Sequence, residues 1–131
     1  VLQGAKVLLA EDNALNIEIA EFFLQEVGVR VTRAVDGRQA VEAFAASPEG
    51  FYDAILMDVM MPVMDGFEAS RAIRALDRPD AATVPILAMT AQASDECAQS
   101  CHQVGMNGRL VKPLDAKKLA KSIREAVQNK Q

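Results

Sequence analysis

The chain has 131 residues and a net charge of −4, and 50% of its residues are apolar and 24% charged. This length corresponds to one domain, which buries roughly two-thirds of the surface of its extended chain. The negative charge excludes a general attraction to nucleic acid or acidic membranes, and we find neither a run near the ~18 apolar residues of a membrane helix nor a signal-peptide pattern at the N-terminus.

Short apolar runs alternate along the chain with segments in which apolar residues recur at helical spacing. The runs predict strands at 6–10, 29–34, 54–58, 85–90 and 109–111, the second of them near a sheet edge. The helical spacing predicts helices from after 13 to 27, from 36 to about 46, from about 67 to 76, from 94 to 104, and from 115 to about 127.

Five strand–helix units in a chain of this length imply a parallel sheet with helices on both faces. Because no repeat, low-complexity tract or linker interrupts them, we expect one domain at 6–129. Residues 1–5 would be a lead or the end of a linker, and 130–131 a short tail.

Ligands of open parallel sheets bind beyond the carboxyl ends of the strands. Those ends carry Glu11-Asp12, Asp58, Thr90 and Lys112-Pro113. Carboxylates ~4 Å apart repel each other by roughly 4 kcal/mol per pair at a surface-like dielectric, and one lysine cannot neutralise three of them. A divalent cation would supply the remaining positive charge, and all-oxygen ligands favour Mg²⁺ over Zn²⁺. We therefore expect Asp58 to meet a metal ion and a lysine.

Four segments resemble, in order and spacing, the receiver domain of two-component response regulators: LLAEDN (8–13), LMDVMMPVMDG (56–66), AMTA (88–91) and LVKP (110–113). The resemblance extends from about Lys6 to Val127. It implies a flavodoxin-like (βα)5 fold with strand order 2-1-3-4-5. Asn16 and the GMN at 105–107 are most similar to receivers attached to hybrid sensor histidine kinases.

The resemblance implies a phosphorelay function. Asp58 would accept a phosphoryl group from a partner's phosphohistidine and become an aspartyl phosphate. Asp12, Asp58 and the backbone carbonyl of Met60 would bind Mg²⁺, or Mn²⁺ in its place, and Glu11 would bind the ion directly or through water.

Further roles follow from the same resemblance. Lys112 would pair with a phosphoryl oxygen, and Thr90 would donate a hydroxyl hydrogen bond to it. The peptide bond between Lys112 and Pro113 would be cis. Met60 and Gln92 occupy positions that tune how fast the aspartyl phosphate hydrolyses.

Arg109 departs from the family pattern, which usually has an inward-turning Tyr or Phe three residues before the lysine. Gly108 likewise replaces a more usual acidic residue. Because an arginine loses far more hydration than an aromatic ring on entering the interior, we expect Arg109 to stay at the surface. Phosphorylation would survive this change, whereas the usual coupling of the threonine to an aromatic residue is in question.

Cys97, Cys101 and His102 have spacings that also suggest a metal site. However, the two cysteines fit one apolar helical face, no fourth ligand is apparent, and positions i and i+4 of a helix suit a disulfide poorly. We interpret the two cysteines as packed free thiols, which indicate a reducing compartment.

Three other functions fit parts of the pattern. A pseudo-receiver would signal without phosphorylation. A phosphohydrolase of the haloacid-dehalogenase type would usually need a second aspartate where this chain has Met60, together with a cap domain. A flavodoxin-like binding module would need a Ser/Thr/Gly-rich loop after the first strand, which is missing here.

The receiver interpretation also predicts the setting of the domain. We expect no ATP-dependent kinase activity, but self-phosphorylation from small phosphodonors and slow autodephosphorylation. The partners would be a histidine kinase and a histidine phosphotransfer domain, with no direct contact to nucleic acid or membrane. The domain would be a monomer or weak dimer in the cytoplasm, alone or as the cytoplasmic part of a membrane-anchored sensor kinase.

Overall fold

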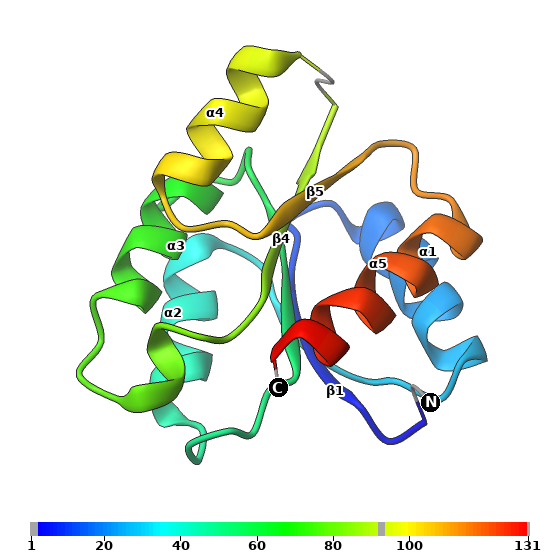
Figure 1. Cartoon of the computed structure of the whole chain (residues 1–131). Helices are drawn as coiled ribbons and strands as arrows, with labels where there is room; N and C mark the ends of the chain where they lie inside the picture. The colour runs from blue at the N-terminus through cyan, green and yellow to red at the C-terminus, as the bar shows by residue number, and fades with distance from the viewer. Residues whose placement is uncertain (1–2, 92–93, 131) are drawn as a thin grey trace.

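Five parallel strands form a sheet at the centre of the molecule. The computed structural model describes residues 3–91 and 94–130. The strands lie in the order β2-β1-β3-β4-β5, so that β2 and β5 form the two edges, as predicted. Figure 1 shows the sheet between the helices. They are β1 (Lys6–Ala10), β2 (Arg30–Ala34), β3 (Ala54–Asp58), β4 (Ile86–Thr90) and β5 (Gly108–Val111).

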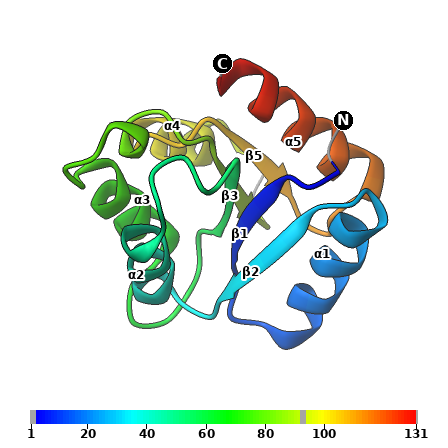
Figure 2. The same cartoon turned by 90° about the horizontal axis from the view of Figure 1, so that it is seen from below.

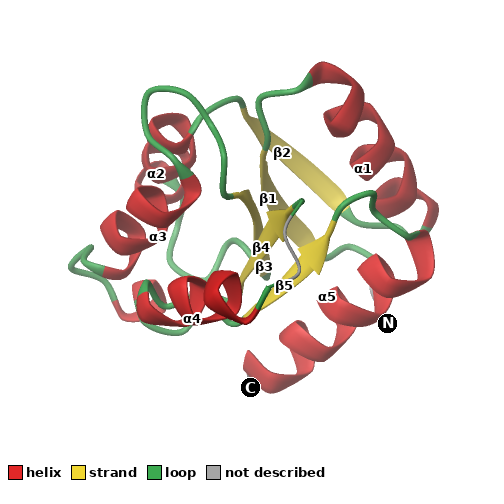
Figure 3. Ribbon diagram, turned by 90° about the horizontal axis from the view of Figure 1, so that it is seen from above, coloured by secondary structure: helices red, strands yellow, loops and turns green. Residues whose placement is uncertain are grey.

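Helices cover both faces of the sheet. In the described part of the chain they are α1 (Ala14–Glu26), α2 (Gly37–Ala46), α3 (Gly66–Arg74), α4 (Asp95–Gln103) and α5 (Ala116–Lys130). Helices α1 and α5 lie on one face and α2, α3 and α4 on the other (Figures 2 and 3). None of these helices is both long and apolar enough to cross a membrane.

The strands divide the interior into two apolar cores. Successive residues of a strand point to opposite faces of the sheet. Leu8 and Ile55 therefore join the core beneath α2, α3 and α4, while Leu9 and Leu56 join the core beneath α1 and α5. Because both faces are covered, β3 is buried along its whole length. Asp58, its last residue, thus ends a fully buried strand.

Polar caps start the helices close to the carboxyl ends of the strands. The side chains of Asn13, Asp36, Asp65 and Ser94 each accept a hydrogen bond from the backbone N–H three residues later. These bonds satisfy N–H groups that the first helical turn leaves without a partner. The caps keep the connections short, and therefore hold Glu11 and Asp12 beside the end of β1.

Helix α3 ends earlier than its apolar pattern predicts. We expected a helix from about 67 to 76, but α3 begins at Gly66 behind an Asp65–Glu68 capping box and ends at Arg74. Leu76 still packs against the core beyond the helix end, which extends the apolar pattern past the last turn. A short 3₁₀ helix, η1 (Pro79–Ala81), follows and was not predicted.

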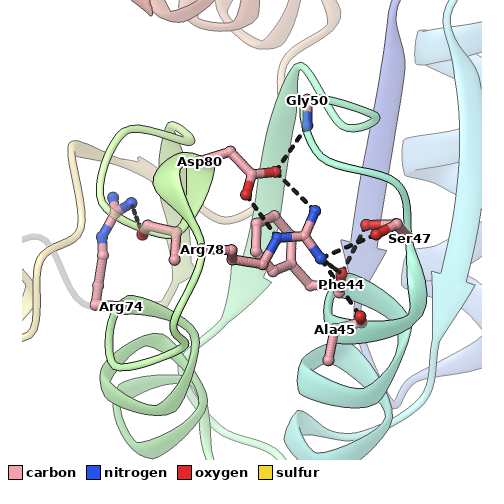
Figure 4. Close-up of polar contacts among 8 residues, drawn as sticks. Phe44, Ala45, Ser47, Gly50, Arg74, Arg78 and Asp80 are labelled. Atoms are coloured by element: carbon pink, nitrogen blue, oxygen red, sulfur yellow. Dashed lines mark hydrogen bonds and ion pairs between the residues drawn. The ribbon is translucent and has the colours of Figure 1, made fainter.

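Arg78 ties the connection after α3 to the end of α2 (Figure 4). Its guanidinium stacks over the Phe44 ring and forms an ion pair with Asp80, whose Oδ2 also accepts the Gly50 N–H at 2.8 Å. The same guanidinium donates to the carbonyl oxygens of Phe44, Ala45 and Ser47. One arginine thus adds hydrogen bonds to carbonyls at the C-terminal end of α2, where the helix itself supplies few donors.

Candidate functional site

Four strand ends bring functional side chains to one edge of the sheet. Glu11 follows β1, Asp58 ends β3, Thr90 ends β4 and Lys112 follows β5. Parallel strands all present their carboxyl ends at the same edge, so residues up to 101 positions apart come into contact. Glu11, Asp58 and Thr90 are buried there, whereas Asp12 is exposed.

Lys112 joins two buried carboxylates at this edge. Its Nζ donates to Glu11 Oε2 at 3.0 Å and to Asp58 Oδ2 at 3.1 Å. Glu11 and Asp58 are only 2% and 3% exposed, so water cannot solvate their charges. Buried charges need a partner, and Lys112 provides one for both. The lysine that Asp58 was expected to meet is therefore present.

The charges of this cluster are unbalanced. Burial, followed by the hydrogen bond and charge of Glu11, raises the pKa of Asp58 to about 6, and the opposing effect of Lys112 is smaller. Burial acts to lower the pKa of Lys112, but its bonds to Glu11 and Asp58 outweigh that effect and raise it. Asp58 is thus held in a site where its negative charge is incompletely compensated.

Glu11 is held by the start of α1 as well as by Lys112. Its Oε1 accepts the Asn13 N–H at 3.2 Å and a long bond from Asn16 Nδ2 at 3.5 Å. Because Oε2 accepts from Lys112, both oxygens of Glu11 already have protein partners. The carboxylate is therefore oriented by its neighbours.

The carboxylates of Glu11, Asp12 and Asp58 fit a divalent cation. One oxygen of each lies within 4.8 Å of the others. The set is all oxygen and combines buried and exposed groups, which suits a hard cation that keeps some of its water. The chemistry of these side chains therefore matches Mg²⁺.

The loop between β3 and α3 packs tightly over Asp58. A Cβ on Gly66 would lie 2.2 Å from the Asp58 carbonyl oxygen, and one on Gly37 would lie 2.2 Å from the Met64 carbonyl oxygen. Met60 N donates to Asp58 Oδ1 at 3.2 Å, while the Met60 side chain is 77% exposed. Glycine is therefore required at two places where backbone approaches backbone.

Thr90 lies beside α4. The Cys97 Sγ, in the first turn of α4, is 3.7 Å from Thr90 Oγ1. Both residues line a cleft of about 440 Å³, which Val59, Met60 and Phe67 border on the other side. The strand-end hydroxyl is thus placed between the acidic edge and a helix.

The structure also places the remaining predicted residues. Arg109 is half-buried in β5, and its Nη1 donates to the Ser94 carbonyl at 2.6 Å. The bond between Lys112 and Pro113 is cis. Cys97 and Cys101 are buried free thiols, as expected. Gln92 lies outside the described residues.

Sequence reasoning missed three contacts of this region. They are the bond from Asn16 to Glu11, the approach of Gly66 to the Asp58 backbone, and the bond from Arg109 to Ser94. Of these three contacts, only the approach of Gly66 had a signal in the sequence, namely a glycine directly after the helix-capping Asp65.

The fold and the edge residues together define a class of doubly wound α/β domains with an acidic, lysine-containing site. The chain belongs to the response regulator receiver domain family, whose family model matches residues 7–124.

Curated relatives are histidine kinases. The chain is 40% identical over 118 residues to the peroxide stress-activated histidine kinase mak1 of Schizosaccharomyces pombe, covering 89% of this chain and 7% of that protein. It is 34% identical to histidine kinase 1 of Arabidopsis thaliana, covering 93% of this chain and 13% of that protein. The chain thus spans a small part of these relatives, and that part is a receiver rather than a kinase domain.

Solved structures agree with this assignment. The receiver domain of a sensor histidine kinase from Pseudomonas aeruginosa, with a magnesium ion in its active-site cleft, has a TM-score of 0.86 and 40% identity, covering 95% of this chain and 98% of that one. A complex of the Saccharomyces cerevisiae histidine phosphotransfer protein Ypd1 with the receiver domain of Ssk1 has a TM-score of 0.84 and 29% identity. The match covers 98% of this chain and 92% of that one.

Proposed function

We propose that Asp58 is the phosphoacceptor of this receiver and takes a phosphoryl group from a phosphohistidine. The observation that carries this proposal is the buried Asp58 carboxylate, bound by Lys112 Nζ at 3.1 Å within a cluster of three carboxylates. In the transfer, an Asp58 oxygen bonds to phosphorus and the P–N bond breaks. The electron pair returns to the imidazole nitrogen, which leaves an aspartyl phosphate and histidine.

Two side chains of the site would stabilise the transferred group. The ammonium of Lys112 already contacts Asp58, and it would pair with a phosphoryl oxygen as a point charge. The hydroxyl of Thr90 ends the neighbouring strand, and would donate a hydrogen bond to a second oxygen. Lys112 is in contact with Asp58 before transfer, and Thr90 ends the strand that pairs with β3.

A divalent cation would complete the site. Asp12, Asp58 and the backbone carbonyl of Met60 would hold Mg²⁺, and Mn²⁺ would fit the same oxygen ligands. Glu11 would act through a coordinated water, because both of its oxygens already accept hydrogen bonds. When bound, the ion neutralises charge on the transferring group and aligns it with Asp58.

The acyl phosphate would hydrolyse slowly without a partner. Met60 stands two residues after Asp58 with its side chain 77% exposed, above the site rather than packed in the core. An apolar side chain there would obstruct an incoming water. We therefore include slow autodephosphorylation in the proposed activity, and Gln92 keeps its predicted influence on that step.

The partner would dock beside the site on α1. Leu15, Ile19 and Phe22 are large apolar side chains that are 64%, 38% and 61% exposed. An adjoining groove of about 350 Å³ is lined by Ile19, Phe23 and Lys112 among others, so the apolar surface is continuous with the site. This surface suits a histidine phosphotransfer or kinase domain that must bring an imidazole to Asp58.

The domain limits and location belong to the same proposal. Residues 6–129 would form the receiver, with 1–5 as a lead and 130–131 as a tail. The two free thiols are consistent with a reducing cytoplasmic location, whether the domain acts alone or as part of a membrane-anchored sensor kinase. It would act as a monomer or weak dimer.

The test is the intact mass of the protein after incubation with phosphoramidate, with and without Mg²⁺, beside an Asp58→Asn control. We expect one phosphoryl adduct that requires the cation and is lost in the control. If rapid quenching shows no adduct on the native protein, the domain is a pseudo-receiver that signals by binding alone. An adduct that persists in the control would place the acceptor elsewhere.

A further inference from the structure

Helix α4 is held at its first turn by groups from two different strands. Ser94, its N-cap, accepts the Cys97 N–H at 3.1 Å through its hydroxyl, and its carbonyl accepts the Arg109 Nη1–H at 2.6 Å. Arg109 belongs to the edge strand β5, which lies beside α4 (Figure 3). A guanidinium from the sheet edge thus fixes the residue that begins the helix.

The same turn of α4 contacts Thr90. Cys97 Sγ lies 3.7 Å from Thr90 Oγ1, and the two residues are 7% and 2% exposed. Thr90 is also joined to the end of β5: it pairs with Val111, and its carbonyl accepts the N–H of Lys112, the next residue, at 2.7 Å. The contacts therefore close a ring that runs from Thr90 to Cys97, Ser94, Arg109 and back along β5.

The charge of Arg109 does not favour helix formation at this end. A cation beside a helix N-terminus interacts unfavourably with the helix dipole. Asp95 and Glu96 occupy the first turn and offset part of that effect. Burial raises the pKa of the Cys101 thiol, and the charge of Arg109 acts in the opposite direction. Its directed bond to the Ser94 carbonyl therefore explains its placement better than a dipole effect does.

We propose that Arg109 is a positioning residue that holds the first turn of α4 so that Cys97 keeps the Thr90 hydroxyl in place for the phosphoryl group. Arg109 acts through Ser94 and Cys97 and touches no reacting atom. Without the guanidinium, the first turn of α4 loses an anchor to the sheet, and Thr90 becomes a less well placed donor. The kinetic part of this inference rests on the proposed function of Asp58.

The test compares Arg109→Ala and Arg109→Lys with the native protein. The matched control is Arg30→Ala, because Arg30 is an exposed arginine in the opposite edge strand, β2. Initial rate, dependence on phosphoramidate concentration and half-life of the adduct are measured by intact mass with Mg²⁺. We expect Arg109→Ala to lower the maximal rate by about threefold to tenfold, the net effect of one ordinary hydrogen bond, with little change in the half-saturating concentration.

Two further measurements separate positioning from a general loss of stability. Arg109→Lys should restore part of the rate, because an ammonium can donate to the same carbonyl. In a Cys97→Ala background, Arg109→Ala should have a smaller effect than in the native protein, because both residues act through the same ring. Fully additive effects of the two substitutions would overturn the proposal.

Backbone amide NMR shifts, measured without a phosphoryl donor, test separately whether Arg109 holds Cys97 and Thr90 in place. Arg109→Ala should shift the Thr90 and Cys97 amides, and Arg30→Ala should not. Unchanged shifts, or phosphorylation rates of Arg109→Ala equal to those of Arg30→Ala, would overturn the role of Arg109. Absence of any adduct on the native protein would instead remove the proposed function and leave the shifts to decide whether Arg109 holds Thr90.

Discussion

Lys112 Nζ lies 3.1 Å from Asp58 Oδ2, although 54 positions separate the two residues in the chain. The contact follows from the sheet, because β4 lies between β3 and β5 and all three strands end at the same edge. Lys112 also binds Glu11, so a single ammonium compensates two buried carboxylates. Its loss would leave both carboxylates without the ammonium that pairs with them, at the place where a phosphoryl group would add further negative charge.

Lys112→Ala should therefore impair phosphorylation. We expect the rate of adduct formation from phosphoramidate to fall by about 100-fold, a typical loss for a preorganised charged donor. Lys117→Ala, which removes an exposed lysine from α5, is the control and should match the native protein. A rate for Lys112→Ala within twofold of the control would contradict the role given to this lysine.

Gly66→Ala should damage the acceptor site through the backbone. Its Cβ would lie 2.2 Å from the Asp58 carbonyl oxygen, so the β3–α3 loop would have to move. We expect a loss of about 1–3 kcal/mol in unfolding free energy and slower phosphorylation. In Gly108→Ala, the new Cβ meets only the end of the Leu87 side chain at 3.3 Å, which can give way. Urea denaturation of both variants tests this, and equal losses would show that the close approach is not the cause.

The contact between Arg78 and Asp80 predicts a pH-dependent contribution to stability. The hydrogen bond from Arg78 holds the pKa of Asp80 below its ordinary value. A lowered folded-state pKa means that this stabilisation is complete above the unfolded-state pKa, near 4, and disappears as the pH falls through the lower folded-state value. Asp80→Asn should thus cost about 1–2 kcal/mol at pH 7 and progressively less below about pH 4.

Urea titrations of the native protein and Asp80→Asn at several pH values measure this difference. Asp77→Asn, at an exposed aspartate in the same connection, should have no such effect. A difference that stays constant down to pH 2 would show that the carboxylate charge is not involved.

The exposed apolar face of α1 predicts that a substitution there slows phosphorylation by a protein donor but not by a small-molecule donor. Phe22 is 61% exposed, so Phe22→Ala should leave stability almost unchanged. If a partner covers this ring, phosphoryl transfer should fall by about tenfold or more, the effect of leaving one large apolar side chain unburied. Transfer from phosphoramidate should be unaffected, because that donor needs no docking surface.

The test donor for this comparison is phosphorylated Ypd1 from Saccharomyces cerevisiae, the histidine phosphotransfer protein found in complex with the Ssk1 receiver. Val27→Ala, at the far end of α1, is the control for a partly exposed apolar residue. Equal rates for Phe22→Ala, Val27→Ala and the native protein from Ypd1 would place the docking surface elsewhere.

Much of the fold and the composition of the site could be predicted from the sequence. The strand order was expected from the resemblance to receiver domains, whereas the two-sided cover and the meeting of Glu11, Asp58 and Lys112 follow from alternating apolar runs and from the common direction of parallel strands. Such features depend on periodicity, which is present in the chain itself.

The remaining features depend on loop geometry that has no local signature. Arg109 finds a backbone carbonyl at Ser94, and any residue can supply a carbonyl. Arg78 likewise binds two carbonyls of α2 and that of its C-cap Ser47, and α3 stops at Arg74 although apolar residues continue to Leu76. These contacts are decided by where the connections lie in space.

The two buried thiols of α4 allow the opening of this helix to be measured directly. Cys97 and Cys101 are the only cysteines of the chain, and both face inward from α4 at 7% and 4% exposure. A thiol reagent can therefore reach them only when this helix moves away from the sheet. The labelling rate in the native state measures how often α4 opens, without any added probe. Comparing that rate before and after phosphorylation would follow the motion of one helix in solution.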